Sequence, residues 1–292
     1  MEHGKDAPAP GTGGGETGFS ALSLAHAAEE IVRAGTGTSV DWQRMSLNTH
    51  FQPVFDVRRA RHAGFEALVR AIDDEGAVSW HEVHGRTSER ARVLLDWTCR
   101  AMHLRNYATV DPGDLTLFIN VHPEAAVRDA GRAKEFAGLI RYYGLAPRRV
   151  CVEILQAACS SEAKLREAVD GYRDLGVSIA VGDFGTGCSN FDRVVALRPG
   201  VVKIDRSLLA GTVGDERSCR MLPGIVALLH EAHTKVAVEG IETRAEAMLA
   251  IEAKADFLQG TFFASPQATL ADGGAGRERL DQLLHAARRV AA

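Results

Sequence analysis

The chain has 292 residues, of which 25% are charged, and a formal net charge of −4. This small negative charge provides no global basic field, so nucleic acid is not an expected partner. No apolar run approaches the length of a membrane span, and the N-terminus lacks the apolar segment of a secretory signal. The five cysteines are scattered and lack C-x-x-C spacing, which argues against a disulfide framework and a structural zinc site. We therefore expect a cytoplasmic protein.

The N-terminal segment differs in composition from the rest of the chain. Residues 1–19 are rich in Gly, Pro and Ala, which predicts a disordered tail. The apolar spacing from Ser20 to Ala34 then predicts one amphipathic helix, which Gly35 ends. Residues 20–46 are assigned to this helix and a linker, and residues 47–292 to one barrel domain. The helix would pack on that domain or, as the alternative, bind a partner.

From residue 47 onward, β-rich runs alternate with helical patterns. The predicted strands are 51–57, 63–70, 115–121, 149–155, 177–184, 200–205, 235–240 and 255–263. The predicted helices are 88–106, 130–143, 162–175, 188–196, 217–233, 244–252 and 277 to the end. This alternation predicts an α/β fold, a TIM-like (β/α)₈ barrel, with an open doubly wound sheet as the alternative. The connection from Val57 to Ala63 is too short for a crossover helix, so the first strand should run antiparallel to the second.

Polar residues stand near the carboxyl ends of nearly all these strands, where barrel enzymes build their active sites. These residues are Glu66, Asn120, Glu153, Asp183, Lys203, Glu239 and Gln259. Carboxylates and amide oxygens without histidine suit Mg²⁺ or Mn²⁺ and not zinc. Such a site suits metal-assisted phosphoester hydrolysis, in which Lys203 would orient a water or offset charge in the transition state.

The motifs around these residues resemble, in order, those of the EAL family of cyclic-di-GMP phosphodiesterases. The resemblance runs from about Phe51 to Pro266, so it covers most of the chain. Its motifs are FQPVFD, GFEALVR, FINVHPE, VEIL, GDFGTG, VVKIDRSLL, AVEGIET and FLQGTFFASP. The number and order of these matches make the resemblance specific, although each short motif alone is weak.

The resemblance implies a role for each matching residue and cyclic-di-GMP as the ligand. The metal ligands, for Mg²⁺ or Mn²⁺, would be Glu66, Asn120, Glu153 and Asp183. The catalytic residues would be Lys203 and Glu239, the lysine near the attacking water and the glutamate serving a second metal. The substrate-binding residues would be Gln52, Arg70, Asp205 and Gln259. Glu242 matches a supporting acidic position.

The chain departs from the family pattern at four positions. Gly182 replaces the first Asp of the paired-Asp loop, a carboxylate that the family shares between two metals, and this loss weakens metal binding. Gln156 replaces the second Glu of the Glu-Ile-Thr-Glu strand, next to Leu155 in place of Thr. Loss of this glutamate should loosen the loop that it anchors, and small misplacements are costly in rate. His122 stands where the family usually has Ser.

The sequence is compatible with three functions. The first is a degenerate EAL domain that binds cyclic-di-GMP with weak or absent hydrolysis, and the retained Gln52, Arg70 and Asp205 favour it. The second is an active metal-dependent phosphodiesterase that produces pGpG. The third is a protein-interaction regulator that does not bind nucleotide. A protein partner and a homodimer are further expectations, and the dimer rests on family analogy alone.

Overall fold

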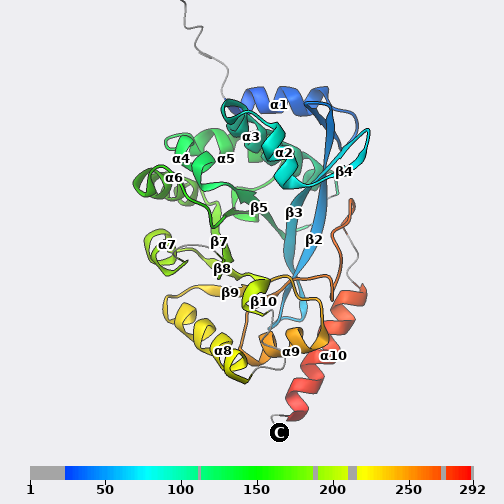
Figure 1. The fold of residues 1–292 in the computed structure, drawn as a ribbon, viewed down its shortest axis with the longest axis vertical. Coiled ribbons are helices and arrows are strands. Elements are labelled where there is room, and N and C mark those ends of the chain that lie inside the picture. The colour runs from blue at the N-terminus through cyan, green and yellow to red at the C-terminus, as the bar shows by residue number, and fades with distance from the viewer. Residues whose placement is uncertain (1–23, 111–112, 187–189, 210–215, 271–273, 291–292) are drawn as a thin grey trace, which may run out of the picture.

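A computed structural model describes residues 24–110, 113–186, 190–209, 216–270 and 274–290 (Figure 1). Eight strands form a closed barrel, in the order β2-β10-β9-β8-β7-β6-β5-β3 and back to β2. Their bounds are β2 Met45–Asp56, β3 Arg61–Asp73, β5 Thr116–Val121, β6 Val150–Ile154, β7 Ser178–Phe184, β8 Val201–Ile204, β9 Lys235–Val238 and β10 Phe257–Leu258. The closure confirms the predicted barrel and excludes the open sheet.

Strand β2 runs antiparallel to both of its neighbours in the barrel, β3 and β10, and all other barrel neighbours are parallel. Only four residues join β2 to β3, and the last of them, Ala60, has a positive φ of 49°. Such a tight connection can make only a hairpin, because a parallel pair needs a crossover of a dozen or more residues. The predicted orientation of the first strand is therefore confirmed.

Helices surround the barrel on its outer face (Figure 1). Their bounds are α3 Glu89–Thr109, α5 Ala133–Tyr142, α6 Glu162–Asp174, α7 Asn190–Leu197, α8 Glu216–Glu231, α9 Arg244–Glu252 and α10 Gly274–Val290. Two short helices were not predicted, α2 Trp80–Arg86 and α4 Pro123–Arg128. Within the described ranges, no helix is both long and apolar enough to cross a bilayer.

The N-terminal segment contains more structure than the sequence indicates. Helix α1, Leu24–Ala34, lies against α3 and buries Ala28 and Val32. Residues 40–46, predicted as linker, contain strand β1, Val40–Trp42, and the start of β2, with which β1 pairs antiparallel. That part of the linker prediction is wrong, because the pairing of β1 supplies its hydrogen bonds from β2. Residues 1–19, the predicted tail, and residues 20–23 lie outside the described residues.

Two other strand predictions need correction. The hairpin strand β4, Gly76–Val78, was missed. The last predicted strand, 255–263, is strand only at Phe257–Leu258, because the backbone of Gly260 then passes against Ile241. A Cβ on Gly260 would lie 2.0 Å from the Ile241 carbonyl oxygen, so the close approach requires glycine here.

Side chains inside the barrel separate into an apolar floor and a polar upper layer. The floor is a buried cluster of Val54, Phe118, Cys151, Ala180, Ala237 and Phe257. Because strand side chains alternate, the residue two positions further along each parallel strand also points into the barrel. The positions above the floor are therefore Asn120, Glu153, Gly182, Glu239 and Gln259. The strand period thus brings residues from distant parts of the sequence to one end of the barrel.

Helix α9 follows the strand that carries Glu239 and begins with a capping box. The Thr243 hydroxyl accepts a hydrogen bond from the Glu246 N–H at 3.2 Å, and the Glu246 carboxylate accepts one from the Thr243 N–H at 2.9 Å. Replacing Thr243 with Ala should lower the free energy of unfolding by about 1 kcal/mol, measured by urea denaturation. Thr243→Ser, which keeps the hydroxyl, should retain most of this stability, and equal losses in both variants would contradict the capping role.

Candidate active site

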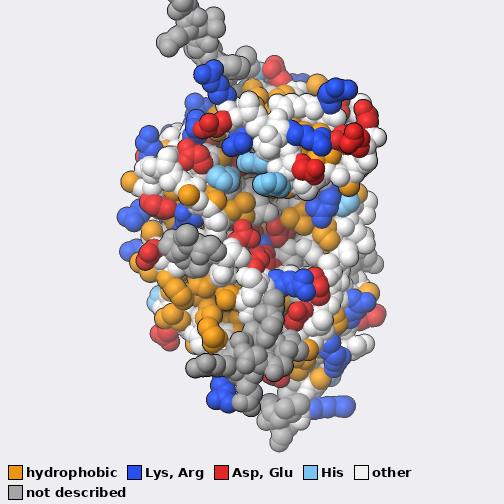
Figure 2. Space-filling view, viewed as in Figure 1, with side chains coloured by type: hydrophobic (Ala, Val, Ile, Leu, Met, Phe, Trp, Pro, Cys, Tyr) orange, Lys and Arg blue, Asp and Glu red, His pale blue; other side chains and the backbone are white. Residues whose placement is uncertain are grey.

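A lysine lies at the centre of the polar layer. The Lys203 Nζ is 2.6 Å from Glu66 Oε2, 2.8 Å from Glu153 Oε2 and 2.8 Å from Glu239 Oε2. These four side chains come from β3, β6, β8 and the end of β9, and only 1% of Lys203 is exposed. Acidic side chains lie in the hollow at the middle of the face seen in Figure 2. We call Lys203 with these three glutamates the carboxylate ring.

Three amide side chains complete this layer. Asn120 Nδ2 donates to Glu66 Oε1 at 2.7 Å, and Gln259 Nε2 donates to Glu66 Oε2 at 2.7 Å. Gln259 Nε2 also donates to Gln52 Oε1 at 3.1 Å, while Gln52 Nε2 donates to the Ala264 carbonyl at 3.1 Å. The carbonyl oxygens of Asn120 and Gln259 are buried and have no hydrogen-bond partner in the part of the chain that the structure describes. Unpaired buried acceptors are costly, so these two oxygens call for a cation or a donor.

A second acidic group adjoins the ring. Carboxylate oxygens of Asp183, Asp205 and Glu239 all lie within 4.8 Å of one another. Asp205 also caps the short 3-10 helix η2, Arg206–Leu208, where its Oδ1 accepts from the Ser207 N–H at 2.8 Å. The family resemblance implies a metal ligand at Asp183 and a substrate-binding residue at Asp205, and the structure brings the two side chains together. Nearby, Glu242 forms an ion pair with Arg206.

Asp183 reaches this group because strand β7 is irregular. Val181 pairs with Val202 and Phe184 with Ile204, so two residues of β7 face one residue of β8. Gly182 faces the barrel interior, so in a regular strand the side chain of residue 183 would point to the outside of the barrel. Asp183 instead adopts a positive φ of 49°, which breaks this alternation. Bulges of this kind re-aim side chains at active sites, and positive φ in a residue other than glycine stores strain.

The charges in this layer do not balance. Burial, together with the negative charges of Glu66 and Glu239, raises the pKa of Glu153 well above its usual value. The positive charge of Lys203 lowers this pKa but does not cancel the rise. Burial also raises the pKa of Glu239 to about 7. At Glu66 burial is outweighed by Lys203 and by three hydrogen bonds, so its pKa is lowered. Burial and the neighbouring carboxylates raise the pKa of Asp183. One lysine thus serves several buried carboxylates, and the raised pKa values mean that protons offset the excess negative charge when no other cation is bound. A divalent cation bound among these carboxylates would take the place of those protons.

The residues present fit a hard divalent cation. The donors are carboxylate and amide oxygens, which suit Mg²⁺, Mn²⁺ or Ca²⁺, and two buried amide oxygens lack partners. Glu66, Asn120 and Glu153 would hold one ion, and Asp183, Asp205 and Glu239 another. Such an ion, when bound, would polarise a phosphate and lower the pKa of a water.

Gly182 lies directly against the Glu153 carboxylate. A Cβ built on Gly182 would lie 2.2 Å from Glu153 Oε1 and 3.0 Å from Glu153 Cδ. The Glu153 carboxylate therefore occupies the space that an Asp side chain at 182 would enter, and Lys203 holds it there. The absence of a side chain at position 182 thus leaves the space that Glu153 Oε1 fills.

The loop after β6 lacks a side-chain anchor at Gln156. Both polar atoms of the Gln156 side chain are buried, and neither has a hydrogen-bond partner among the described residues. The Gln156 backbone does hydrogen-bond to the Asp183 carboxylate, which offsets part of the rise in the pKa of Asp183. The backbone of this loop therefore contacts the second acidic group, while its side chain contributes no hydrogen bond.

Arg70 is the one predicted site residue that the structure does not bring to this cluster. Its guanidinium is exposed on β3 and donates to the Val69 carbonyl at 3.0 Å. It lies four residues beyond Glu66 on the same strand, so it stands toward the rim of the barrel mouth. The ion pairs of Lys203, in turn, were not predicted, because no sequence pattern specifies which strand ends meet.

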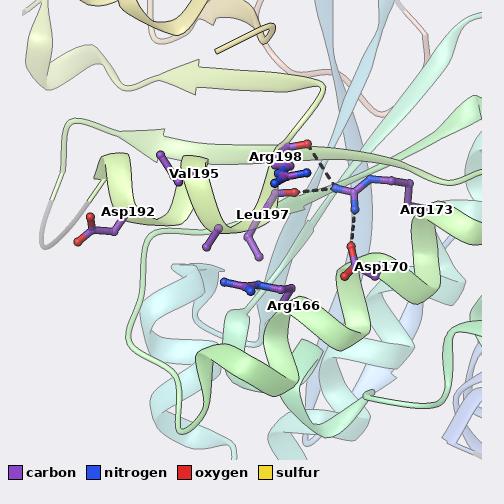
Figure 3. Close-up of a pocket in the computed structure, with 8 residues that line it drawn as sticks. Arg166, Asp170, Arg173, Asp192, Val195, Leu197 and Arg198 are labelled. Atoms are coloured by element: carbon purple, nitrogen blue, oxygen red, sulfur yellow. Dashed lines mark hydrogen bonds and ion pairs between the residues drawn. The ribbon is translucent and has the colours of Figure 1, made fainter.

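A hollow of about 680 Å³ lies between α6 and α7, away from the strand ends (Figure 3). Its lining includes Arg173, which is already bound by Asp170 at 2.5 Å and by the Leu197 carbonyl at 2.6 Å. No group of side chains there resembles the carboxylate ring, so the candidate active site is the barrel mouth.

Residues 39–266 match the family of the EAL domain. The chain belongs to the EAL domain family. The cyclic di-GMP phosphodiesterase NbdA of Pseudomonas aeruginosa is 25% identical over 230 residues, which cover 75% of this chain and 29% of NbdA. The chain thus spans less than a third of the length of NbdA and of other curated relatives.

Solved structures share the fold. The Bacillus subtilis YkuI protein, with an EAL domain and in complex with substrate c-di-GMP and calcium, has a TM-score of 0.73 at 23% identity, covering 84% of this chain and 62% of YkuI. A standalone versatile EAL protein from Vibrio cholerae O395, in its c-di-GMP bound form, has a TM-score of 0.69 at 24% identity, covering 77% of this chain and 94% of its own. At these identities the likeness establishes the fold alone.

Proposed function

We propose that this EAL domain binds cyclic-di-GMP and hydrolyses it weakly or not at all. The observation that carries the proposal is position 182, where glycine supplies no metal ligand and Glu153 fills the resulting space. Glycine at 182 offers no carboxylate that two metals could share, and the affinity for a divalent cation falls when a charged ligand is lost. The orphan side chain of Gln156 adds to this argument, because a loop that is not anchored positions its metal ligands less well.

Retention of the binding residues supports recognition of the nucleotide. Gln52 and Gln259 are held in place by hydrogen bonds at the barrel mouth, and Arg70 has its guanidinium exposed on the adjoining strand. An exposed arginine can form paired hydrogen bonds with a phosphate or a guanine edge. The relatives and the solved structures named for cyclic-di-GMP point to the same ligand.

Calorimetry and product analysis together test this proposal. Wild-type protein should bind cyclic-di-GMP in the presence of Ca²⁺, while incubation for hours with Mg²⁺ or Mn²⁺ should yield little or no pGpG. Arg70→Ala should weaken binding by roughly ten- to a hundredfold, because a charge-assisted contact is worth about 1.5–3 kcal/mol. Turnover at an ordinary enzymatic rate, about 1 per second or faster, would overturn the proposed loss of activity. Absence of binding at high protein concentration would favour a protein-interaction role instead.

An active phosphodiesterase is the second candidate, and a specific observation favours it. Five carboxylates and one lysine remain together at the barrel mouth, which is enough donor oxygen for at least one divalent ion. One metal can still polarise a phosphate and activate a water. Release of pGpG that is removed by chelation and by Glu239→Gln would establish this candidate.

A further inference from the structure

A separate small hollow of about 150 Å³ lies between α2, α3 and α4, above the barrel mouth. Its lining includes His84 from α2, Arg92 from α3 and His122, which precedes α4. The rings of His84 and His122 lie 6.1 Å apart. Histidine side chains are seen above the acidic hollow on the face shown in Figure 2. At about 30 Å³ per water molecule, the space admits a small polyatomic ion.

His122 presents a hydrogen-bond donor to this hollow. Its Nδ1 accepts the N–H of Glu124 at 3.2 Å and so caps α4. A nitrogen that accepts carries no proton, and the neutral ring must then carry its proton on Nε2. This tautomer excludes His122 Nε2 as a metal ligand, because a ligating nitrogen must be free of its proton. The ring therefore favours an acceptor of hydrogen bonds and not a cation.

His84 and Arg92 add further donors that the fold leaves unused. The Arg92 side chain is exposed, and within the described residues its guanidinium makes no hydrogen bond or ion pair. The His84 ring contacts the rings of Trp80 and His122 but has no hydrogen-bond partner in the same part of the chain. Burial and the positive charges of His122, Arg92 and His81 lower the pKa of His84, so these groups act on one another.

The acidic residues of the hollow, by contrast, are mostly engaged elsewhere. Asp96 pairs with the buried Arg100 and accepts the His122 backbone N–H. Glu124 accepts the N–H of Ser160 at 2.8 Å and its hydroxyl at 3.1 Å, and it pairs with Arg128. Glu89 is exposed, so water and salt screen its repulsion of an anion. Asp96 Oδ2 makes no hydrogen bond within the described residues, but its ion pair with Arg100 offsets its charge. Arg92 and the His84 ring therefore supply donors without partners, whereas each buried or half-buried carboxylate already faces a cation or a donor.

We propose that His84, Arg92 and His122 form an anion site that takes a phosphate group, separate from the carboxylate ring. The Arg92 guanidinium supplies a positive charge and paired N–H donors for the anion. The rings of His84 and His122 supply further N–H donors. The 42% exposed Trp80 beside His84 offers an aromatic surface for the base of a nucleotide that carries the phosphate. The site does not depend on the proposed function, because it uses no metal and no residue of the ring.

Histidine-ring NMR signals of the full chain, in chelator at constant ionic strength, test this inference. Inorganic phosphate should shift the ring signals of His84 and His122 saturably, whereas equal chloride should not. Arg92→Gln and His122→Ser should each weaken phosphate binding by roughly tenfold, which corresponds to about 1.4 kcal/mol of binding free energy. Serine at 122 retains a cap for α4, so this variant removes the imidazole without removing the cap. Arg90→Gln, an exposed arginine outside the hollow, is the matched control and should bind normally.

Parallel titrations with GMP distinguish a nucleotide from free phosphate. Tighter binding of GMP than of phosphate, lost in Trp80→Ala, would assign the site to nucleotides, and equal binding would assign it to the phosphate group alone. Either result supports the anion site. Absence of a saturable shift with both probes, or unchanged binding in both Arg92→Gln and His122→Ser, would overturn it. Cyclic-di-GMP binding at the barrel mouth could still be present in that case, so the two proposals fail separately.

Discussion

Replacing Lys203 with Met should lower the free energy of unfolding of the metal-free protein by about 3–5 kcal/mol at neutral pH. Methionine approximates the length of the side chain but removes the ammonium from among Glu66, Glu153 and Glu239. Buried carboxylates would then face one another without a counter-ion, a larger penalty than the loss of a surface ion pair. Chemical denaturation in chelator measures this loss.

Divalent cations and acid should both reduce the penalty in Lys203→Met. Mn²⁺ or Ca²⁺ should stabilise this variant more than wild type. In the variant the ion can occupy the space of the missing ammonium, whereas in wild type it must compete with Lys203 for the same carboxylates. Lowering the pH from about 8 to about 5 should recover part of the stability. Burial raises the pKa of Glu239 to about 7 even beside Lys203, and removal of the ammonium should raise it further. The folded variant therefore binds more protons than the unfolded chain from the ordinary pKa of a glutamate up to 7 and above. Stability therefore falls as pH rises through this window.

Lys235→Met provides the matched control for the lysine substitution. Lys235 lies on the neighbouring strand β9, is exposed, and places its Nζ 5.5 Å from the centre of the Phe257 ring. Its loss should cost less than about 1 kcal/mol and should not respond to divalent ions. A loss of that small size in Lys203→Met as well would contradict the buried counter-ion role.

Replacing Gly182 with Asp should raise the affinity for Mn²⁺ by at least about tenfold and increase pGpG release. The new Cβ would meet Glu153 Oε1 at 2.2 Å, so the Glu153 carboxylate must rotate away. Glu153 is a long side chain and can move, although Lys203 holds its other oxygen at 2.8 Å. The metal-free variant should be less stable than wild type, because another carboxylate joins a buried acidic group, and Mn²⁺ should reverse the difference.

Gly182→Ala separates the steric effect from the ligand effect. It adds the same Cβ against Glu153 but no oxygen, so it should lose stability without gaining metal affinity. Adding Gln156→Glu to Gly182→Asp should raise turnover further, since it returns a carboxylate to the loop after β6. Calorimetry with Mn²⁺ and product analysis measure these effects. Unchanged metal affinity and turnover in the double variant would show that neither loss limits the site.

The chain itself determined the barrel and most of the residues at its mouth. Alternating strands and helices predict the closed fold, and a period of two along each strand predicts that Glu66, Asn120 and Glu153 point to one end. The short link before Ala63 predicts the antiparallel first strand. These features are local in sequence, so they are visible before any long-range contact is known. The glycine at 182 is likewise evident from the motif around it.

Only the tertiary structure decided how these side chains are arranged. The ion pairs of Lys203 join strands that lie far apart in the sequence, and their distances depend on barrel closure. The bulge that turns Asp183 inward depends on the register between β7 and β8. The position of the Glu153 carboxylate against Gly182 likewise depends on the packed neighbours of both residues. Composition and spacing specify which groups reach the barrel mouth, whereas packing and electrostatics fix the contacts they make there.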